Sequence, residues 1–286
     1  MFHICDLTTY DEFLAVRAIQ QQCWGFAAGE GLYPPMLNTA AHNGGTVLGA
    51  FDADRMIGFL FGFLGLHHGK RLKLCSQTLG VLPDYRNRGV AEALKWAQRD
   101  RMLALGIDLI TWTYDPLEAP NARLNLHTLG GIAYEYERNI YGENFGALGQ
   151  GLPSDRFLVE WWLNSERAER RAAGRGIERQ ADDSRVANVC GGMGAERHIE
   201  SVNLALDVPE VQVEIPIDIQ AIKQTSLSLA LDWRLATRQI FEAYFQRGYC
   251  AVDLARVGTG DAQQNFYILK RNCYSGPVDS GDQSQV

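Results

Sequence analysis

The sequence has few cysteines, and they are not arranged for a metal site or a disulfide scaffold. Its six cysteines in 286 residues form no CxxC pair, so the ligand spacing of a zinc site is absent. Small secreted domains held by disulfides have a much higher cysteine density. We therefore expect reduced thiols, a cytoplasmic location and no metal ion.

The sequence also lacks long apolar runs and long runs of like charge. The most apolar run, GFLFGFLGL at 58–66, has nine residues, whereas a membrane-spanning helix needs about 20. The N-terminal MFHICDLTTYDE has no basic segment followed by an apolar one, so we expect no signal peptide. A formal net charge of −7 without a basic tract argues against nucleic-acid and membrane partners.

What is present is a chain that is 46% hydrophobic and long enough for about two domains. In its first part, strand-like apolar runs alternate with helical spacing, which is typical of a mixed α/β sheet. We predict strands at 2–7, 46–51, 56–66, 73–82, 107–114, 132–142 and 157–163. We predict helices at 11–25, 88–106 and 121–129.

Composition changes near residue 165, where the chain becomes charged, rich in glycine and poor in large apolar residues. In the last third, apolar residues at helical spacing predict a helix at 227–248, with strands at 211–217, 249–257 and 265–271. The expected organisation is a domain at 1–164, a charged, glycine-rich linker at 165–207, a small α+β unit at 208–275 and a disordered tail at 276–286.

The segment LGVLPDYRNRGVAEALKWAQ at 79–98 joins an apolar strand to a helix through a glycine-containing turn. Main-chain N–H groups at a helix start have no partner inside the helix, and with the helix dipole they form an anion site. Gly89 lets a phosphate approach the backbone, and Arg86 and Arg88 add positive charge. The pattern indicates a pyrophosphate site, although a turn with two solvated arginines fits the same residues. Rossmann and Walker A patterns are absent.

This segment resembles the acyl-CoA-binding segment of the GCN5-related N-acetyltransferase (GNAT) superfamily. In that family an apolar strand and a V-x-P-like turn precede [QR]xxGx[GA] and a helix, and Val81, Pro83, Arg86, Gly89 and Ala91 match. Downstream, NARLNLHTLGGIAYEY resembles the second cofactor segment. The resemblance covers roughly residues 1–164. It implies a mixed α/β, GNAT-like acyl-CoA N-acyltransferase fold, and the whole chain resembles a long predicted-acetyltransferase subgroup with a C-terminal extension.

The resemblance also implies how acetyl-CoA, or another acyl-CoA, would bind as the acyl donor. Strand residues Leu79 to Val81 would pair with the pantetheine arm, and the N–H near Val81 would polarise the thioester carbonyl. Asn121 or Asn125 would contact the pantetheine or a phosphate. The pyrophosphate would be held by the turn residues Arg86, Asn87, Arg88, Gly89, Val90 and Ala91.

The general acid and base are not fixed by the resemblance. Many family members carry a tyrosine four residues before the glycine that ends the second helix, but here that position is Leu126. The candidates for the acid are His127, Tyr134, Tyr136 and Tyr141, and those for the base are Glu30, His67, His68 and Glu135. For any one of these residues taken singly, an ordinary structural role is the favoured interpretation.

Arg156, in the segment SDRFLVEWWL, is a candidate for binding a carboxylate of the acceptor or of a dicarboxylic acyl group, or for capping a loop. The resulting hypothesis is an N-acyltransferase that transfers an acetyl or succinyl group to the amine of a small molecule or amino acid. One alternative is a non-catalytic acyl-CoA sensor, and another is a protein or peptide N-acetyltransferase. We expect the C-terminal unit to cover the acceptor cleft or to form a homodimer contact.

Overall fold

The computed structural model describes residues 1–27, 29–142, 151–175, 183–259 and 263–273. The strands of its first part are β1 (Phe2–Asp6), β2 (Thr46–Asp52), β3 (Arg55–His67), β4 (Arg71–Val81), β5 (Leu109–Tyr114), β6 (Ile132–Glu137) and β7 (Arg156–Trp162). The later strands are β8 (Asn188–Gly191), β9 (His198–Val202), β10 (Glu210–Ile215), β11 (Tyr249–Val257) and β12 (Gln264–Arg271). The longer helices are α1 (Tyr10–Trp24), α2 (Pro34–His42), α3 (Val90–Ala104), α6 (Glu166–Ala172), α7 (Ile219–Thr225) and α8 (Leu227–Gln246).

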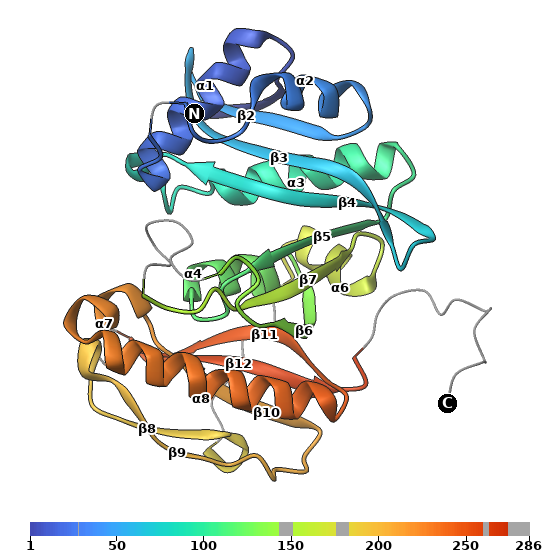
Figure 1. The fold of residues 1–286 in the computed structure, drawn as a ribbon. Coiled ribbons are helices and arrows are strands. Elements are labelled where there is room, and N and C mark those ends of the chain that lie inside the picture. The colour runs from blue at the N-terminus through green and yellow to red at the C-terminus, as the bar shows by residue number, and fades with distance from the viewer. Residues whose placement is uncertain (28, 143–150, 176–182, 260–262, 274–286) are drawn as a thin grey trace.

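One ten-stranded sheet runs through both halves of the molecule (Figure 1), in the order β1-β2-β3-β4-β5-β7-β6-β11-β12-β10. Neighbouring strands are antiparallel except β4 and β5, which are parallel and joined by the crossover helix α3. The strand β7 lies between β5 and β6, although it follows β6 in the sequence. The expected mixed α/β class is confirmed.

Helices cover the first half of the sheet on both faces. On one face α1 and α2 pack their apolar residues against Phe59 and Phe61 of β3. On the other face α3 packs Val90 and Leu94 against the intervening residues of β2 and β3. The N-terminus of α1 is fixed by a capping box between Thr9 and Glu12.

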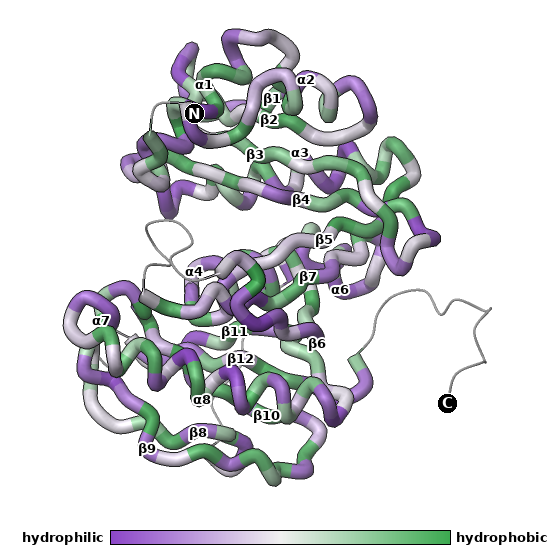
Figure 2. Tube along the Cα trace, in the orientation of Figure 1, coloured by the Kyte–Doolittle hydropathy of each residue, from purple (hydrophilic) through white to green (hydrophobic). Residues whose placement is uncertain are grey.

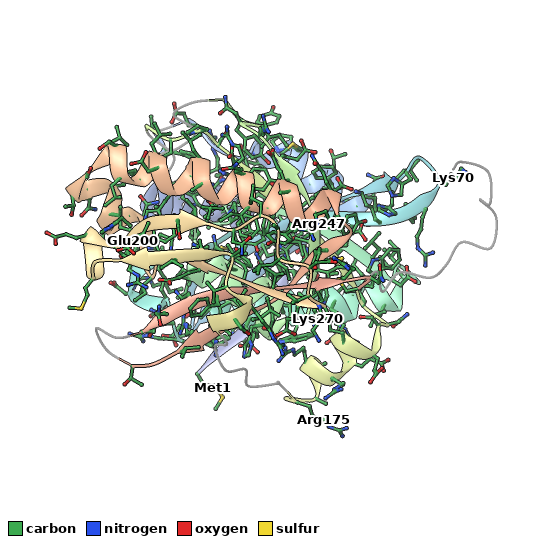
Figure 3. All side chains as sticks on the ribbon, turned by 90° about the horizontal axis from the view of Figure 1, so that it is seen from below. Met1, Lys70, Arg175, Glu200, Arg247 and Lys270 are labelled. Atoms are coloured by element: carbon green, nitrogen blue, oxygen red, sulfur yellow. The ribbon has the colours of Figure 1, made fainter. Side chains whose placement is uncertain are left out.

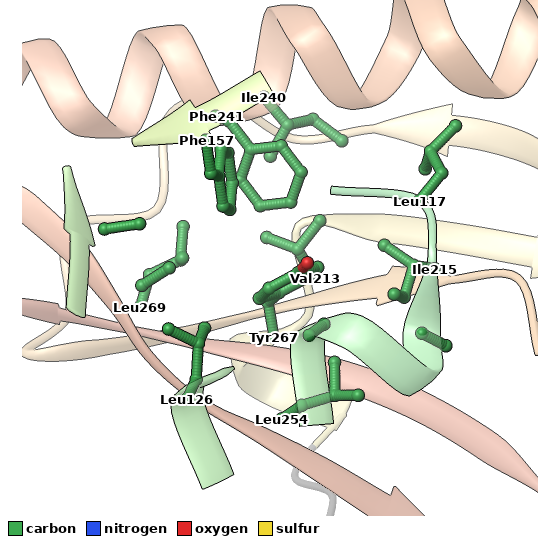
Figure 4. Packing of buried hydrophobic residues seen from close by; sticks show 14 of the residues in the cluster. Leu117, Leu126, Phe157, Val213, Ile215, Ile240, Phe241, Leu254, Tyr267 and Leu269 are labelled. Atoms are coloured by element: carbon green, nitrogen blue, oxygen red, sulfur yellow. The ribbon is translucent and has the colours of Figure 1, made fainter. Parts of the chain in front are cut away.

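The C-terminal strands continue this sheet because β11 pairs with β6, where Ala251 lies opposite Ala133. One buried cluster joins the two halves. Phe157 of β7 contacts Phe241 of α8 at a ring distance of 4.7 Å and Tyr267 of β12 at 5.5 Å (Figure 4). The part of the chain expected to be a separate small unit therefore shares a hydrophobic core with the first part.

Several elements were not expected from the sequence. Helix α2 begins with Pro34-Pro35, α7 precedes α8, and the charged segment after residue 165 contains the hairpin β8–β9. Asn188 anchors that hairpin, because its side chain bonds both main-chain groups of Glu214 on β10. The expected tail at 276–286 lies outside the described residues. The domain boundaries stay a prediction.

The hydropathy of the residues follows the arrangement of the sheet and its covering helices. Figure 2 shows apolar residues along the strands and polar residues on the outer helices and turns. Viewed from below, the charged side chains of Lys70, Arg175 and Glu200 extend from the rim of the molecule (Figure 3). Within the described part of the chain, every helix is too short or too polar to cross a membrane.

Replacing Phe241 by alanine tests the shared core. Phe241→Ala removes a fully buried ring from a cluster that both halves contribute to, so we expect a loss of about 3–5 kcal/mol in the free energy of unfolding. Urea unfolding should remain a single transition, with circular dichroism and tryptophan fluorescence coinciding. The control is Leu235→Ala on the exposed face of the same helix. Two separate transitions in the parent protein would contradict a shared core.

Candidate active site

The sheet opens between β4 and β5. These two strands pair only at Leu74–Ile110 and Cys75–Thr111, and they diverge beyond that point (Figure 1). In β4, Gln77 is an extra residue that has no partner in β3, so β4 is bulged just after the last pair. The rest of β4, from Ser76 to Val81, therefore has an edge that β5 does not occupy.

The main-chain groups on this edge belong to alternate residues of β4. The Leu82 N–H donates to Ile57 of β3 at 2.9 Å, and neighbouring residues of a strand point their main-chain groups to opposite sides. Val81 and Leu79 therefore direct their N–H groups toward β5. Among the described residues neither N–H has a protein acceptor, whereas the Val81 carbonyl accepts from the Cys23 thiol at 3.2 Å.

Beyond β4 the chain makes a tight turn into α3. Two residues of this turn have left-handed backbone, Asn87 at φ 59° and Gly89 at φ 80°, a conformation that glycine and asparagine adopt most easily. Gly89 is the N-cap of α3, and a β-carbon there would meet no atom within 4 Å. In the described structure the N–H groups of residues 87–91 have no protein acceptor. The turn thus presents several main-chain donors to an open space, as an anion site requires.

The arginines beside the turn take different positions. The Arg86 Nε lies 3.4 Å from the Val81 carbonyl oxygen, so this side chain folds back onto the end of β4. The Arg88 guanidinium lies over the Tyr85 ring at 5.1 Å, and the Tyr85 hydroxyl donates to Asp52 at 2.9 Å. Arg86 therefore orders the end of the open edge, and Arg88 remains at the surface beside the turn.

A comparison with protein families agrees with this geometry. Residues 13–129, which begin within α1 and end within the segment NARLNLHTLGGIAYEY at 121–136, match the model of the acetyltransferase (GNAT) family. The resemblance to the GNAT superfamily expected from the sequence is therefore confirmed for residues 13–129, the segment that the family model covers. The GNAT-like fold expected from the motif at 79–98 is confirmed.

Solved structures with a similar fold include several acetyltransferases. The ribosomal-protein-S18-alanine N-acetyltransferase of Escherichia coli has 18% identity and a TM-score of 0.44, covering 56% of this chain and 92% of its own. NAA60 of Arabidopsis thaliana, solved with a bisubstrate analogue, has 16% identity and a TM-score of 0.46, covering 57% and 98%. At these scores the likeness carries no argument about the substrate. No curated protein matched the chain.

Of the candidate acids, Tyr141 contacts the part of β5 that lies beyond its last pair with β4. Its hydroxyl is 3.0 Å from Thr113 Oγ1. Thr113 is two residues past the last β4–β5 pair, so by register it faces the stretch from Gln77 to Leu79 across the gap. The Arg156 guanidinium covers the Tyr141 ring at 5.4 Å.

The segment that carries Tyr141 is held by the C-terminal helix. Asp155 is fully buried and accepts two hydrogen bonds from Arg238 of α8, at 2.8 and 2.9 Å. The same carboxylate accepts from the Tyr136 hydroxyl at 2.7 Å and the Asn139 N–H at 3.0 Å. Next to it, the Tyr141 N–H donates to Ser154 at 2.9 Å. Helix α8 thus fixes both ends of the β6–β7 connection.

The other candidate acids occupy structural positions. Tyr136 meets the Phe157 ring edge-on and stacks on Phe241, and burial raises the pKa of its hydroxyl. Tyr134 donates to Glu160 at 2.5 Å. His127 is 2.9 Å from Asp253 of β11, so it belongs to the contact between the two halves.

Of the candidate bases, Glu30 lies apart, whereas His67, His68 and Glu135 lie around the buried carboxylate of Glu160. Glu30 accepts from the Ala27 N–H at 2.8 Å within its own loop. His67 packs on His68 and lies 3.5 Å from Glu160, and burial lowers the pKa of His67. Glu135 lies on β6 opposite Leu158. Burial, and then the charge of Glu160, raise the pKa of Glu135.

The candidate residues for binding the acceptor and the cofactor differ in burial, and Arg156 already contacts other residues of the protein. Arg156 donates to the Asp155 carbonyl at 2.8 Å and lies 3.7 Å from Asp115, so part of its charge is already compensated. Asn125 is buried in the helix that follows α4 (Ala119–Ala122), whereas Asn121 is exposed on α4. The roles of these residues, like those of the candidate acids and bases, stay predictions.

Sequence reasoning overlooked three residues at or behind the site. Lys95 is buried under the point where β4 and β5 part, and Asp155 and Arg238 form the ion pair that holds the Tyr141 segment. One indication in the sequence that Lys95 is buried is its place next to Leu94, on the apolar face of a predicted helix. Nothing local in the sequence pairs Asp155 with Arg238, which is 83 residues away.

Replacing Asp253 tests the contact between β11 and the segment that carries His127. Burial would raise the pKa of the Asp253 carboxyl, but the hydrogen bond to His127 and the charges of Arg171 and Arg167 outweigh it, so the pKa is lowered. A lowered pKa stabilises the folded state above the ordinary pKa of about 4, and this contribution is lost as the pH falls.

We therefore expect Asp253→Asn to lose about 3 kcal/mol in the free energy of unfolding at pH 7, because buried Arg171 loses its counter-charge. The difference from the parent should shrink as the pH falls from about 4, where the carboxyl of the unfolded chain becomes protonated, through the lower pKa of the folded protein. Urea unfolding across this pH range measures it. A difference that does not change with pH would show that the carboxylate charge is unimportant.

Proposed function

We propose that this protein is an acyl-CoA-dependent N-acyltransferase that acts on the amine of a small molecule or amino acid. The observation that carries the proposal is the open edge of β4, which leads directly into the donor-rich turn at Gly89 in a GNAT-family domain. The turn N–H groups would bind the pyrophosphate of the donor, and the β4 edge would pair with its pantetheine arm.

The thioester would then lie against the unpaired N–H groups of Leu79 and Val81. A main-chain N–H fixed at this position donates a hydrogen bond that stabilises the negative charge developing on the thioester oxygen during attack. The amine nitrogen forms a bond to the carbonyl carbon, and the carbon–sulfur bond breaks. Tyr141 donates a proton to the departing thiolate across the gap, and a water chain ending at Glu135 takes the proton of the amine.

The acceptor would approach from the face that α1 and α2 cover. A groove of about 550 Å³ lies there between α2 and the middle of β3, and Gln77 of the β4 bulge forms part of its wall. Its other lining residues include Met36, Phe61, Phe63 and Leu64. This lining favours an amine with an apolar body over a highly polar sugar.

The direct test is release of free thiol from acetyl-CoA and succinyl-CoA in the presence of a panel of amines. The panel should contain apolar amino acids, aliphatic amines, aminoglycosides and peptides with free N-termini. We expect amine-dependent thiol release with an apolar amino acid or amine. CoA binding without turnover of any amine would support an acyl-CoA sensor, and turnover of peptides alone would support a peptide acetyltransferase.

Replacing Gly89 tests the phosphate site. Gly89→Val places a branched side chain at a left-handed position in the open space before α3, so it strains the turn and blocks the approach of a phosphate. We expect the dissociation constant for CoA to rise about tenfold or more, measured by calorimetry. Gly69→Val is the matched control, because Gly69 also has φ 71° and open space but lies in the β3–β4 hairpin. Equal effects of the two changes would count against the assignment.

Replacing Tyr141 tests the acid. Tyr141→Phe keeps the ring under Arg156 but removes the hydroxyl that reaches Thr113. We expect kcat to fall about a hundredfold while KM for the acyl-CoA is unchanged, because the hydroxyl acts only as the thiolate leaves. Tyr10→Phe, at an exposed tyrosine on α1, is the control. An unchanged kcat would assign the proton to water instead.

A further inference from the structure

Lys95 is an unusual residue for its surroundings. It lies on the second turn of α3 with 4% of its surface exposed. Its ammonium donates to Ser76 Oγ at 2.8 Å and lies 3.6 Å from the centre of the Trp112 ring. No carboxylate of the described residues forms an ion pair with it. Lysine is rarely buried to this degree without a counter-charge.

The position of Lys95 relates it to the open edge. Ser76 and Trp112 are the first residues beyond the last β4–β5 pair, Cys75–Thr111. The lysine head group is therefore at the closed end of the gap, on the α3 side of the sheet. A donor whose pantetheine arm follows the β4 edge from the Gly89 turn would point its acyl group toward this end.

We propose that Lys95 binds the distal carboxylate of a dicarboxylic acyl group of four or five carbons, and so makes the enzyme select such donors over acetyl-CoA. This inference rests on the proposed function, because the thioester must lie at Leu79–Val81. The Ser76 hydroxyl and the Trp112 ring position the lysine, and the acyl carboxylate supplies the missing counter-charge.

The distances fit a donor of this length. Leu79 and Ser76 are two to three strand residues apart once the bulge is allowed for, which is roughly 7–10 Å. The three carbon–carbon bonds of a succinyl group reach roughly 4–5 Å, and a hydrogen bond adds about 2.8 Å. An acetyl group ends well short of Lys95.

Electrostatics supports the same assignment. Burial without a nearby acid lowers the pKa of the Lys95 ammonium. Binding of a carboxylate beside it would restore the charged form, since an opposite charge favours protonation. A purely aliphatic acyl group would leave N–H donors of Lys95 facing hydrocarbon, which is unfavourable.

Calorimetric binding of CoA, butyryl-CoA and succinyl-CoA tests this inference without knowledge of the acceptor. The last two ligands have acyl chains of similar length and differ in the terminal carboxylate. We expect the parent protein to bind succinyl-CoA about tenfold to a hundredfold more tightly than butyryl-CoA, the range of a charged hydrogen bond. In Lys95→Met, which retains the length of the side chain, the two affinities should agree within about twofold.

Lys73→Met is the matched control, because Lys73 lies on the same strand as Ser76 but is only half-buried, and it should keep the parent preference. Ser76→Ala, which removes only the hydrogen bond to Lys95, should reduce the preference and is the second variant if Lys95→Met does not fold. If the parent binds succinyl-CoA and butyryl-CoA equally well, the inference is overturned, but binding of CoA still supports the proposed function. Failure of all three ligands to bind would overturn both.

Discussion

The divergence of β4 and β5 is the constraint on which the rest of the site depends. Parallel strands normally stay paired, and unpaired main-chain groups inside a sheet are costly unless another partner satisfies them. Here the pairing ends after Cys75–Thr111, and the bulge at Gln77 turns the free part of β4 away from β5. A long polar ligand with an amide-containing arm can take the place of the missing strand.

The C-terminal half of the chain contributes residues that position the strands and the segment beside this gap. Helix α8 supplies Arg238 to Asp155 and the almost fully buried Arg234 to Asp115, at 2.5 Å. Asp115 follows β5, the strand that borders the gap, and Asp155 precedes β7, the next strand of the sheet. Asp115 and Asp155 are therefore held in place by residues about 80 to 120 positions later in the chain.

The features that could be predicted from the sequence are those that depend on residues close together in the chain. The turn at Arg86–Gly89, the crossover helix and the long helix at 227–248 were all recognisable, because each depends on residues within a few positions of one another. Helix α2 was not predicted, because paired prolines are typical of loops, although proline also fits the first turn of a helix. The setting of Lys95, the contact of Tyr141 with Thr113 and the shared core could not be predicted, since each depends on distant segments meeting in the fold.

The central claim is that the main-chain donors of the β4 edge and the following turn bind an acyl-CoA. Amide hydrogen exchange of the full-length protein, with and without saturating CoA, tests it most directly, because it reports individual N–H groups. The account predicts that the amides of Leu79, Val81 and residues 87–91 become protected, while the amides at the outer edge of β10 do not change. Unchanged exchange at those amides, with CoA shown to bind, would place the ligand elsewhere and contradict the account.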